Sequence, residues 1–178
     1  MFNQYPDHLA IFTDASKLNN NGPVGSAVWI PKYKIILSFK LPPGNSVFSG
    51  EAVALLEAVS YIYSHHLNKS IILTDSLSCL QDIVKRPFHA KENFSITLKI
   101  KDLLYKCHLE NIQVMLAWIP SHSGITGNEI ADQCAKEAIT IGNHMYDRCF
   151  PRDIKAQALI HLRDAWNTRW QTTQLQTP

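Results

Sequence analysis

The order of strand-like and helix-like segments constrains the fold of this chain more than any other feature of its sequence. The segments in order are strands over 9–14, 24–30 and 33–40, a helix over 48–65, a strand over 70–74, helices over 76–84 and 94–107, a strand over 112–118 and a helix over 126–140. Turn residues at 19–23 and a tight hairpin at Pro31-Lys32 favour antiparallel pairing of the first three strands. Alternating helices and strands after such a trio predict an α/β fold, with a mixed sheet flanked by helices.

The C-terminal part of the chain departs from this alternation. Residues 141–150 are expected to form a linker, and residues 152–171 a further helix with an apolar stripe. We therefore expect a domain over 9–140, followed by a linker and helical extension over 141–178. Trp166 and Trp170 are four residues apart on the extension and share one helix face. That face could cap the domain, form a dimer or dock on a segment of a longer protein.

Composition limits the functions open to the chain. It has 178 residues, of which 46% are hydrophobic and 18% charged, as expected for a globular protein with a core. A net charge of +2 does not by itself indicate nucleic-acid binding, so any basic surface must be local. We expect no membrane span, no signal peptide and no zinc site, since the four cysteines form no C-x-x-C pair. These features favour an intracellular protein, nuclear or cytoplasmic.

Four acidic residues lie next to apolar segments that are expected to be buried, where a carboxylate is unfavourable without a binding partner. Asp14 and Asp75 follow apolar, strand-like runs, and Glu51 and Asp132 lie in helix-like stretches rich in Ala and Leu. Ligand sites in such sheets lie at the carboxyl ends of strands. A buried, unpaired carboxylate is unfavourable, and divalent cations such as Mg²⁺ or Mn²⁺ are its usual partners. The pattern predicts a two-metal phosphoryl-transfer enzyme.

Several of these residues also have plain structural interpretations. Any one carboxylate could be a helix cap or a surface charge, and Glu51 in the first turn of its helix is favoured by the helix dipole. The segment from Thr126 to Glu129 fits a capping box. Trp29 and Trp118 lie in strands and are expected in the core. The joint pattern of four carboxylates favours metal binding over these separate interpretations.

Four motifs, in order, resemble those of one family. The motifs are Thr13-Asp14-Ala15-Ser16, Ser49-Gly50-Glu51-Ala52, Leu73-Thr74-Asp75-Ser76, and the segment from Trp118-Ile119-Pro120-Ser121-His122 to Gly127-Asn128-Glu129-Ile130-Ala131-Asp132. They resemble type 1 ribonuclease H domains, and most of all those of insect-type non-LTR retrotransposon polyproteins. The resemblance covers about residues 9–140, and four motifs in the right order make it specific.

The resemblance implies a fold and a reaction. The implied fold is ribonuclease H-like, with a five-stranded mixed sheet of order 32145. The implied reaction is metal-dependent hydrolysis of the RNA strand of an RNA–DNA hybrid, leaving 3′-hydroxyl and 5′-phosphate ends. It further implies two Mg²⁺ ions, replaceable by Mn²⁺, with Asp14 bridging both, Glu51 and Asp75 completing one site and Asp132 the other.

The resemblance also suggests residues around the metals. His122, in a loop before the last domain helix, would protonate the leaving group or help product release; the alternative is a histidine that caps the helix. The expected contacts to the nucleic acid are Ser16, Asn45, Ser46 and Ser76. Two features depart from the family: Ala15 replaces the usual Gly, and no long basic, Trp-bearing insertion separates the helices over 76–84 and 94–107.

These departures and the low net charge predict weak intrinsic affinity for hybrid, with steep salt sensitivity. A reverse transcriptase domain of the same polyprotein would supply the missing affinity. Two alternatives remain: a catalytically weak or silent nucleic-acid-binding or assembly module, and a nuclease of the same fold that cuts DNA. The sequence leaves the oligomeric state open.

Overall fold

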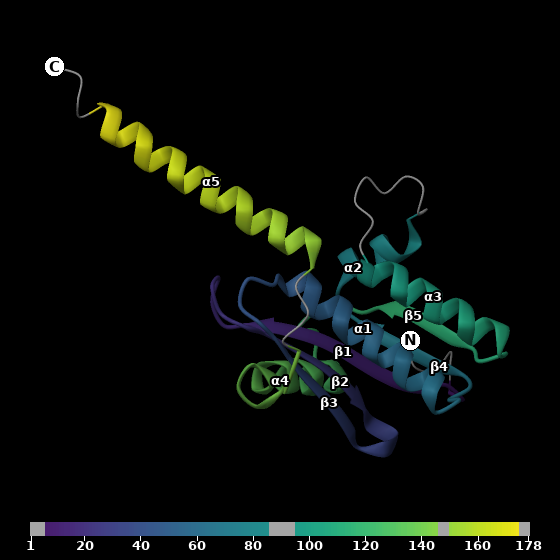
Figure 1. Cartoon of the computed structure of the whole chain (residues 1–178). Helices are drawn as coiled ribbons and strands as arrows, with labels where there is room; N and C mark the ends of the chain where they lie inside the picture. Colours follow the sequence, from purple (N-terminus) through teal and green to yellow (C-terminus); the bar gives the residue numbers. More distant parts are fainter. Residues whose placement is uncertain (1–5, 86–94, 146–149, 175–178) are drawn as a thin grey trace.

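A mixed sheet forms the centre of the molecule (Figure 1). The computed structural model describes residues 6–85, 95–145 and 150–174. Within these residues the sheet has six strands in the order β5-β4-β1-β2-β3-β6. The strands are β1 (Leu9–Lys17), β2 (Val24–Ile30), β3 (Ile35–Leu41), β4 (Ser70–Thr74), β5 (Val114–Trp118) and β6 (Asn143–His144). Strands β1, β2 and β3 pair antiparallel, whereas β4 and β5 run parallel to β1.

The predicted strand order 32145 is therefore confirmed, with β6 added outside β3. Residues 141–150 were expected to form a linker, but Asn143 and His144 pair with β3 in parallel register. Two residues are too short to show a pattern of alternating polarity, so this strand left no signal in the sequence. The expected hairpin between these strands is confirmed, but its loop is longer than Pro31-Lys32, with a 3-10 turn over Pro31–Tyr33 followed by a left-handed Lys34.

The register of β1 places Asp14 at a switch in its pairing. Strand β1 pairs with β4 only as far as Thr13, opposite Thr74, but it continues beside β2 to Lys17. Asp14 was expected at the end of its strand and lies instead inside β1. It nevertheless directly follows the last pair shared with β4, as Asp75 does on the neighbouring strand. Parallel pairing thus brings the two carboxylates to the same edge.

Two helices cover one face of the sheet. Helix α1 (Val47–Ser64) crosses β1 and packs beside α3 (Ser95–Leu109), enclosing the larger hydrophobic core. The short α2 (Leu77–Val84) follows β4. Gly50 lets α1 approach the sheet closely, because a Cβ there would lie 2.5 Å from Val24 Cγ1 and 2.8 Å from the Cβ of Ala15. No side chain fits at this contact, so α1 is held against β1 and β2.

Helix α4 (Thr126–Ile141) covers the opposite face. It lies over β1, β2 and β3, and a Cβ at Gly25 would collide with the backbone oxygen of Ala135. The expected capping box is wrong: Ile125 occupies the N-cap without a side-chain hydrogen bond, and Thr126 is already helical. The backbone oxygen of Ile125 instead accepts from the amides of Asn128 and Glu129.

Helix α5 (Pro151–Gln174) projects from the rest of the molecule (Figure 1). Its first turn contacts the domain, and nearly all of its described side chains beyond Asp153 are exposed. The expected apolar stripe faces solvent: Ile154, Leu162 and Trp166 are each more than half exposed. In the part of the chain that the structure describes, no helix combines the length and apolarity that crossing a bilayer requires.

Candidate active site

The four predicted carboxylates line one open cavity of about 290 Å³. Its walls are formed by Asp14, Ala15, Glu51, Asp75, Ser121, His122 and Asp132. These residues come from β1, α1, the end of β4, the loop after β5, and α4. The structure thus brings together four stretches that are far apart in the sequence, because the loop after β5 leads directly into α4. The five predicted catalytic residues all line the cavity.

Asp14 is the most buried of the four carboxylates, with 8% of its surface exposed. Its Oδ1 accepts a hydrogen bond of 2.7 Å from the backbone amide of Ala15. The pKa of Asp14 is raised from 3.8 to about 7. Burial is the largest cause, repulsion by Asp75, Asp132 and Glu51 adds to the rise, and the Ala15 amide opposes it. A carboxylate in this position needs a positive partner to stay ionised at neutral pH.

Glu51 projects from the second turn of α1 rather than from the first turn, as expected from the sequence. The Ser76 hydroxyl donates to Glu51 Oε2, and the Cys79 thiol lies 3.9 Å from the same oxygen. Burial raises the pKa of Glu51, the Ser76 hydrogen bond opposes that rise, and Asp75 adds to it. Burial also raises the pKa of the Cys79 thiol to about 12, so Cys79 faces Glu51 as a neutral group.

Asp75 follows β4 directly, and Trp118 helps to fix its backbone. The indole Nε1 of Trp118 donates to the Asp75 carbonyl oxygen at 3.1 Å, while the Ile119 amide donates to Thr74 at 2.9 Å. Trp118 was expected in the core, but it is 44% exposed, because β5 is an edge strand and α4 does not extend over it. Trp29, by contrast, packs against the smaller hydrophobic core as expected.

Asp132 lies on α4 and is paired with a lysine. Lys136 Nζ is 2.6 Å from Asp132 Oδ2, one helical turn further on. The hydrogen bond and charge of Asp132 raise the pKa of Lys136. A cation at Asp132 must therefore compete with an ammonium group that can swing away into solvent.

Glu129 lies beside His122 and Asp132, two of the residues that line the cavity. In the described part of the chain these three residues offer ligand atoms within 4.8 Å of one another. His122 has a left-handed backbone, with a φ of 48°, and its side chain is exposed. Sequence reasoning assigned Glu129 only to a helix cap and missed this position. The spacing from Glu129 to Asp132, three residues on one helix, was the signal that could have found it.

None of the four predicted nucleic-acid contacts is among the residues that line the cavity, and they differ in burial and hydrogen bonding. Ser46 caps α1 and Ser76 caps α2, each accepting a hydrogen bond from a backbone amide. The Asn45 side chain is buried and donates to the Pro42 carbonyl at 2.9 Å, while the Asn45 carbonyl accepts from Lys17. Ser16 is half-buried on β1. Contact of these four residues with nucleic acid stays a prediction.

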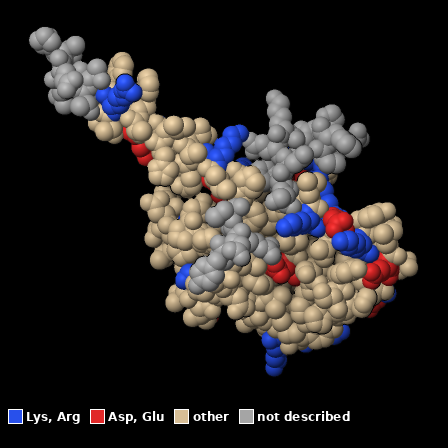
Figure 2. All heavy atoms as spheres, in the orientation of Figure 1, with Lys and Arg blue, Asp and Glu red and all other residues tan. Residues whose placement is uncertain are grey.

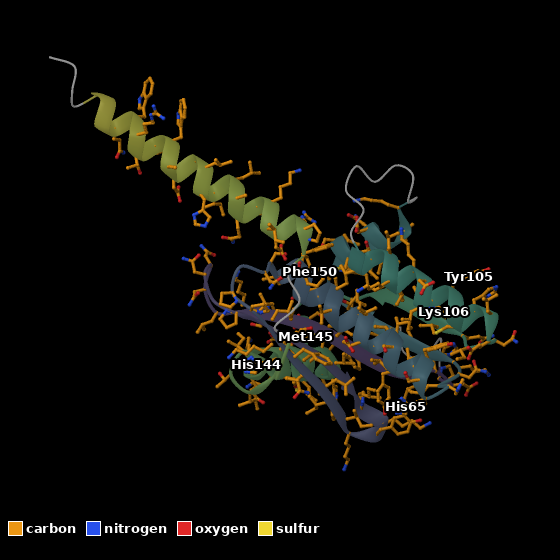
Figure 3. All side chains as sticks on the ribbon, viewed as in Figure 1. His65, Tyr105, Lys106, His144, Met145 and Phe150 are labelled. Carbon is orange, nitrogen blue, oxygen red and sulfur yellow. The ribbon has the colours of Figure 1, made fainter. Side chains whose placement is uncertain are left out.

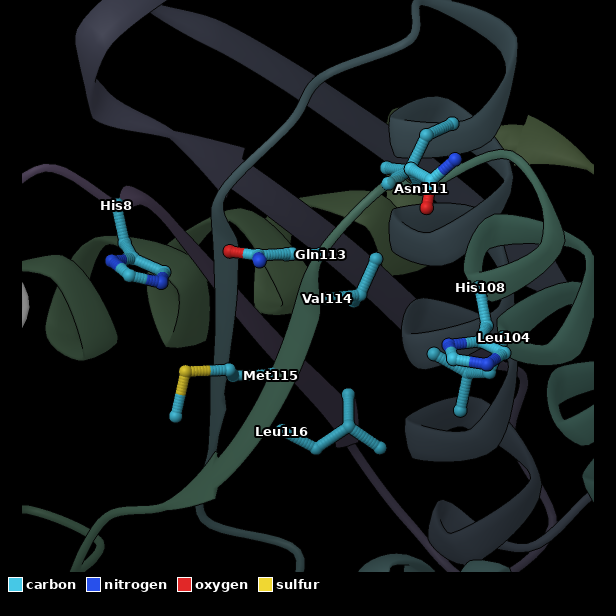
Figure 4. Close-up of a pocket in the computed structure, with 9 residues that line it drawn as sticks. His8, Leu104, His108, Asn111, Gln113, Val114, Met115 and Leu116 are labelled. Atoms are coloured by element: carbon cyan, nitrogen blue, oxygen red, sulfur yellow. The ribbon is translucent and has the colours of Figure 1, made fainter.

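A larger cavity, of about 560 Å³, lies away from the carboxylates at the edge of the sheet (Figure 4). It lies against β5 and α3 and is lined by His8, Leu104, His108, Asn111, Ile112, Gln113, Val114, Met115 and Leu116. None of these lining residues is acidic. We therefore assign the chemistry to the smaller cavity, where carboxylates and a histidine converge.

The donor set of the smaller cavity fits a divalent cation. Four carboxylates face one space, and the raised pKa values of Asp14 and Glu51 result from burial and mutual repulsion. Hard oxygen ligands of this kind suit Mg²⁺, Mn²⁺ or Ca²⁺. Positive charge between the carboxylates would relieve their repulsion, so this arrangement is expected of a metal site.

Comparison with known proteins agrees with this geometry. The model of the RNase H family matches residues 6–140, and the chain belongs to this family. The chain is 24% identical over 147 residues to ribonuclease H1 of Rattus norvegicus, covering 76% of this chain and 52% of that protein. Its identity to ribonuclease H1 of Homo sapiens is also 24%, covering 76% of this chain and 51% of the human protein. The chain spans about half the length of these curated relatives.

Proposed function

We propose that the chain is a ribonuclease H that hydrolyses the RNA strand of RNA–DNA hybrids at the acidic cavity. The observation that carries the proposal is the convergence of Asp14, Glu51, Asp75 and Asp132 on one open space. Membership of the RNase H family and the similarity to two proteins called ribonuclease H1 support it. The products would be 3′-hydroxyl and 5′-phosphate ends.

We assign metal binding to the four carboxylates, with two Mg²⁺ ions as the preferred occupants and Mn²⁺ as a substitute. When bound, such ions activate the attacking water and stabilise charge on the leaving oxygen. Asp14, the most buried of the four carboxylates, would contact both ions. Glu51 and Asp75 would complete one site and Asp132 the other.

The protein groups around these carboxylates fix their positions. Ser76 orients Glu51 by donating to its Oε2, and Trp118 anchors the backbone of Asp75. His122 is exposed and lines the cavity, where an imidazole would deliver a proton to a departing 3′-oxygen. Rigid carboxylates and one accessible proton donor are the arrangement that this hydrolysis requires.

The experiment that tests the proposal is cleavage of a labelled RNA–DNA hybrid with Mg²⁺ or Mn²⁺. Asp75→Asn keeps the shape of the side chain but removes a ligand charge, and we expect it to abolish cutting of the RNA strand. Asp102→Asn is the matched control, because Asp102 is an exposed acid on α3 that pairs with Lys106. Failure of the wild type to cut hybrid in either metal at low salt would contradict the proposal.

A separate variant tests His122. We expect His122→Ala to slow turnover about 10²-fold under saturating metal, as loss of a general acid does. Ser123→Ala, in the same loop, should cut at the wild-type rate. Full turnover by His122→Ala would remove the histidine from the mechanism.

We also propose that the chain derives from a retrotransposon polyprotein and gains affinity from a neighbouring reverse transcriptase domain. The resemblance of residues 118–132 to such elements and the net charge of +2 support this proposal. The chain by itself should then bind hybrid weakly, with affinity falling steeply as salt rises. Submicromolar binding of the isolated chain at physiological salt would count against it.

The second candidate function is a catalytically silent binding module. The ion pair between Lys136 and Asp132 favours it, because an ammonium group already neutralises one of the carboxylates. Binding of hybrid without cleavage in any metal would select this alternative. Cleavage of duplex DNA with none of hybrid would instead select a DNA-cutting nuclease of the same fold.

A further inference from the structure

Helix α5 is anchored to the domain close to the acidic cavity. The Ser49 hydroxyl on α1 donates a 2.5 Å hydrogen bond to the buried Oδ2 of Asp153. The Arg152 guanidinium lies 4.9 Å from the centre of the Phe48 ring, and Phe150 is buried in the larger core (Figure 3). Ser49 precedes Glu51 by two residues on α1. The base of α5 is therefore fixed to the same helix that carries an active-site carboxylate.

Beyond this anchor, one face of α5 combines basic and aromatic side chains. We define the basic tryptophan face as Lys155, Leu159, Leu162, Arg163, Trp166 and Trp170, which helical spacing places on one side of α5. All six are exposed, with Trp166 at 66% and Trp170 at 57%. Figure 2 shows Lys and Arg atoms both towards the outer end of α5 and nearer its base.

The charges of α5 favour an anionic partner for this face. Asp153 is buried at the anchor, and Asp164 lies on the other side of the helix by its spacing from Trp166 and Leu162. The basic tryptophan face thus carries positive charge without an acidic residue. Pairing with the same face of a second copy would bring Lys155 and Arg163 towards like charges, which disfavours a coiled-coil dimer.

The position of the basic residues argues against a membrane. Helices that lie in a bilayer interface keep Lys and Arg on the polar face, opposite the apolar one. On α5, Lys155 and Arg163 lie among the leucines and tryptophans of the same face. Single-stranded nucleic acids match this combination of side chains, because their unpaired bases stack on aromatic side chains and their phosphates contact basic ones.

The two tryptophans favour single strands over duplex. Residues four apart on a helix have Cβ atoms about 5–6 Å apart, so the two indoles can stack on neighbouring unpaired bases. Bases inside a duplex are already stacked and are not available. Eighteen residues of α5, from 157 to 174, reach about 27 Å beyond the anchor at 1.5 Å per residue.

We propose that the basic tryptophan face binds single-stranded nucleic acid that continues beyond a hybrid held at the acidic cavity. Trp166 and Trp170 stack on its bases, and Lys155 and Arg163 contact its phosphates. The inference rests on the proposed function for the identity of the hybrid, but binding to the face is separate from cleavage. The family model ends at residue 140, before α5 begins, so the inference concerns a part of the chain outside that match.

The test measures binding of the full chain carrying Asp75→Asn, which prevents cutting. The probes are a labelled blunt hybrid, the same hybrid with a single-stranded tail of about ten nucleotides at either end, and the free tail as oligo(dT), a length within the range of one single-strand site. We expect the tail to tighten binding about tenfold and to quench tryptophan fluorescence. Trp166→Ala with Trp170→Ala should remove that gain and leave blunt-hybrid affinity unchanged.

The controls separate a contact from a structural effect. Ile160→Ala, on a different side of α5, should keep the full gain, and circular dichroism should show equal helix content in all variants. Arg163→Glu should reduce the gain and its salt dependence. Equal affinity for blunt and tailed hybrid would overturn the inference. So would a tryptophan-dependent dimer in sedimentation, or tryptophan-dependent binding to anionic vesicles without any binding of oligo(dT).

The outcome for this face is distinguishable from the outcome for the active site. With Asp75 intact, the double tryptophan variant should still cut blunt hybrid at the wild-type rate if only the face is altered. If the wild type cuts no hybrid but still binds oligo(dT) through the two tryptophans, the proposed activity fails while the face stands. If the wild type cuts hybrid but the single-stranded tail adds no affinity, the proposed activity stands while the proposal for the basic tryptophan face fails.

Discussion

The acidic cavity and helix α5 differ in how the chain builds them. The cavity gathers side chains from four separate stretches of the sequence, and its carboxylates are held together against their mutual repulsion. The basic tryptophan face comes from one continuous helix, exposed along nearly its whole length. The cavity therefore depends on the whole fold, whereas the face depends on one helix and its anchor. Substitutions should therefore affect the two regions independently.

The largest expected effect is on the cavity, where Asp14→Asn should stabilise the metal-free protein. The pKa of Asp14 is about 7 in the folded chain against an ordinary 3.8. Below pH 3.8 both states hold the proton; between these values only the folded state holds it, so wild-type stability falls as pH rises towards 7. The gain from Asp14→Asn should reach roughly 4 kcal/mol at pH 8.

Urea denaturation in EDTA at pH 8 and pH 5 measures this gain, which should shrink by more than half at the lower pH. The double tryptophan variant of α5 is the control and should show no such pH dependence. A gain from Asp14→Asn that is equal at both pH values would mean that the carboxylate is not held protonated in the fold. Asp14 would then destabilise the metal-free fold less than its burial indicates.

The next effect is stabilisation by metal, which should belong to the cavity alone. At 10 to 100 times its dissociation constant, Mg²⁺ should stabilise the wild type by about 1.4–2.7 kcal/mol at pH 8. Asp75→Asn should lose most of this shift, since it removes a ligand. The α5 tryptophan variant should keep it in full. Thermal melting with and without Mg²⁺ gives the result, and an equal shift in Asp75→Asn would place the ion elsewhere.

The third effect is expected at the anchor that holds the base of α5 on α1. Ser49→Ala leaves the buried Asp153 carboxylate without its hydroxyl donor and should cost about 1–3 kcal/mol of the stability of the α5 base. We expect faster limited proteolysis within α5, with hybrid cleavage at the cavity nearly unchanged. Ser64→Ala, at the exposed end of the same helix, is the matched control. Unchanged proteolysis of Ser49→Ala would show that other contacts hold α5.

The smallest effect is expected at the edge of the cavity. Lys136→Gln frees Asp132 from its ion pair, so the Mg²⁺ concentration for half-maximal cleavage should fall by about two- to five-fold, in keeping with an exposed pair. Lys106→Gln, which breaks a similar pair on α3, should leave that concentration unchanged. A higher requirement for Mg²⁺ in Lys136→Gln would assign the lysine a role in holding substrate instead.

The four carboxylates of the cavity were predicted because they leave local signals in the sequence, whereas the strand order was implied by the resemblance to ribonuclease H domains. Asp14 and Asp75 each follow an apolar run, and an acid in that position is unusual enough to notice. The exposure of Trp118 left no such signal, and the spacing of Glu129 from Asp132 indicates a shared helix face without showing that His122 lies beside them. Whether a strand tryptophan is buried depends on which helix covers the sheet edge, and whether a first-turn glutamate caps or faces a site depends on the preceding loop. Both are settled by tertiary packing.

For helix α5, too, the sequence predicted the helix but not its contacts. The helix over 152–171 was predicted from its own periodicity, but the hydrogen bond between Ser49 and Asp153 joins residues 104 positions apart. No local pattern marks such a partner. The three interpretations left open for Trp166 and Trp170 also differ only in what lies opposite the helix, which a single sequence does not contain.

The contact between Ala15 and Gly50 acts as a spacer for the two halves of the site. Asp14 precedes Ala15 on β1, and Glu51 follows Gly50 on α1, so the gap between these small residues fixes the separation of two carboxylate-bearing backbones. A methyl group added at position 50 would push helix and strand apart and widen the site. The absence of a side chain at Gly50 thus sets the distance between the backbones that carry Asp14 and Glu51. The geometry of the site depends on this glycine as well as on the carboxylates.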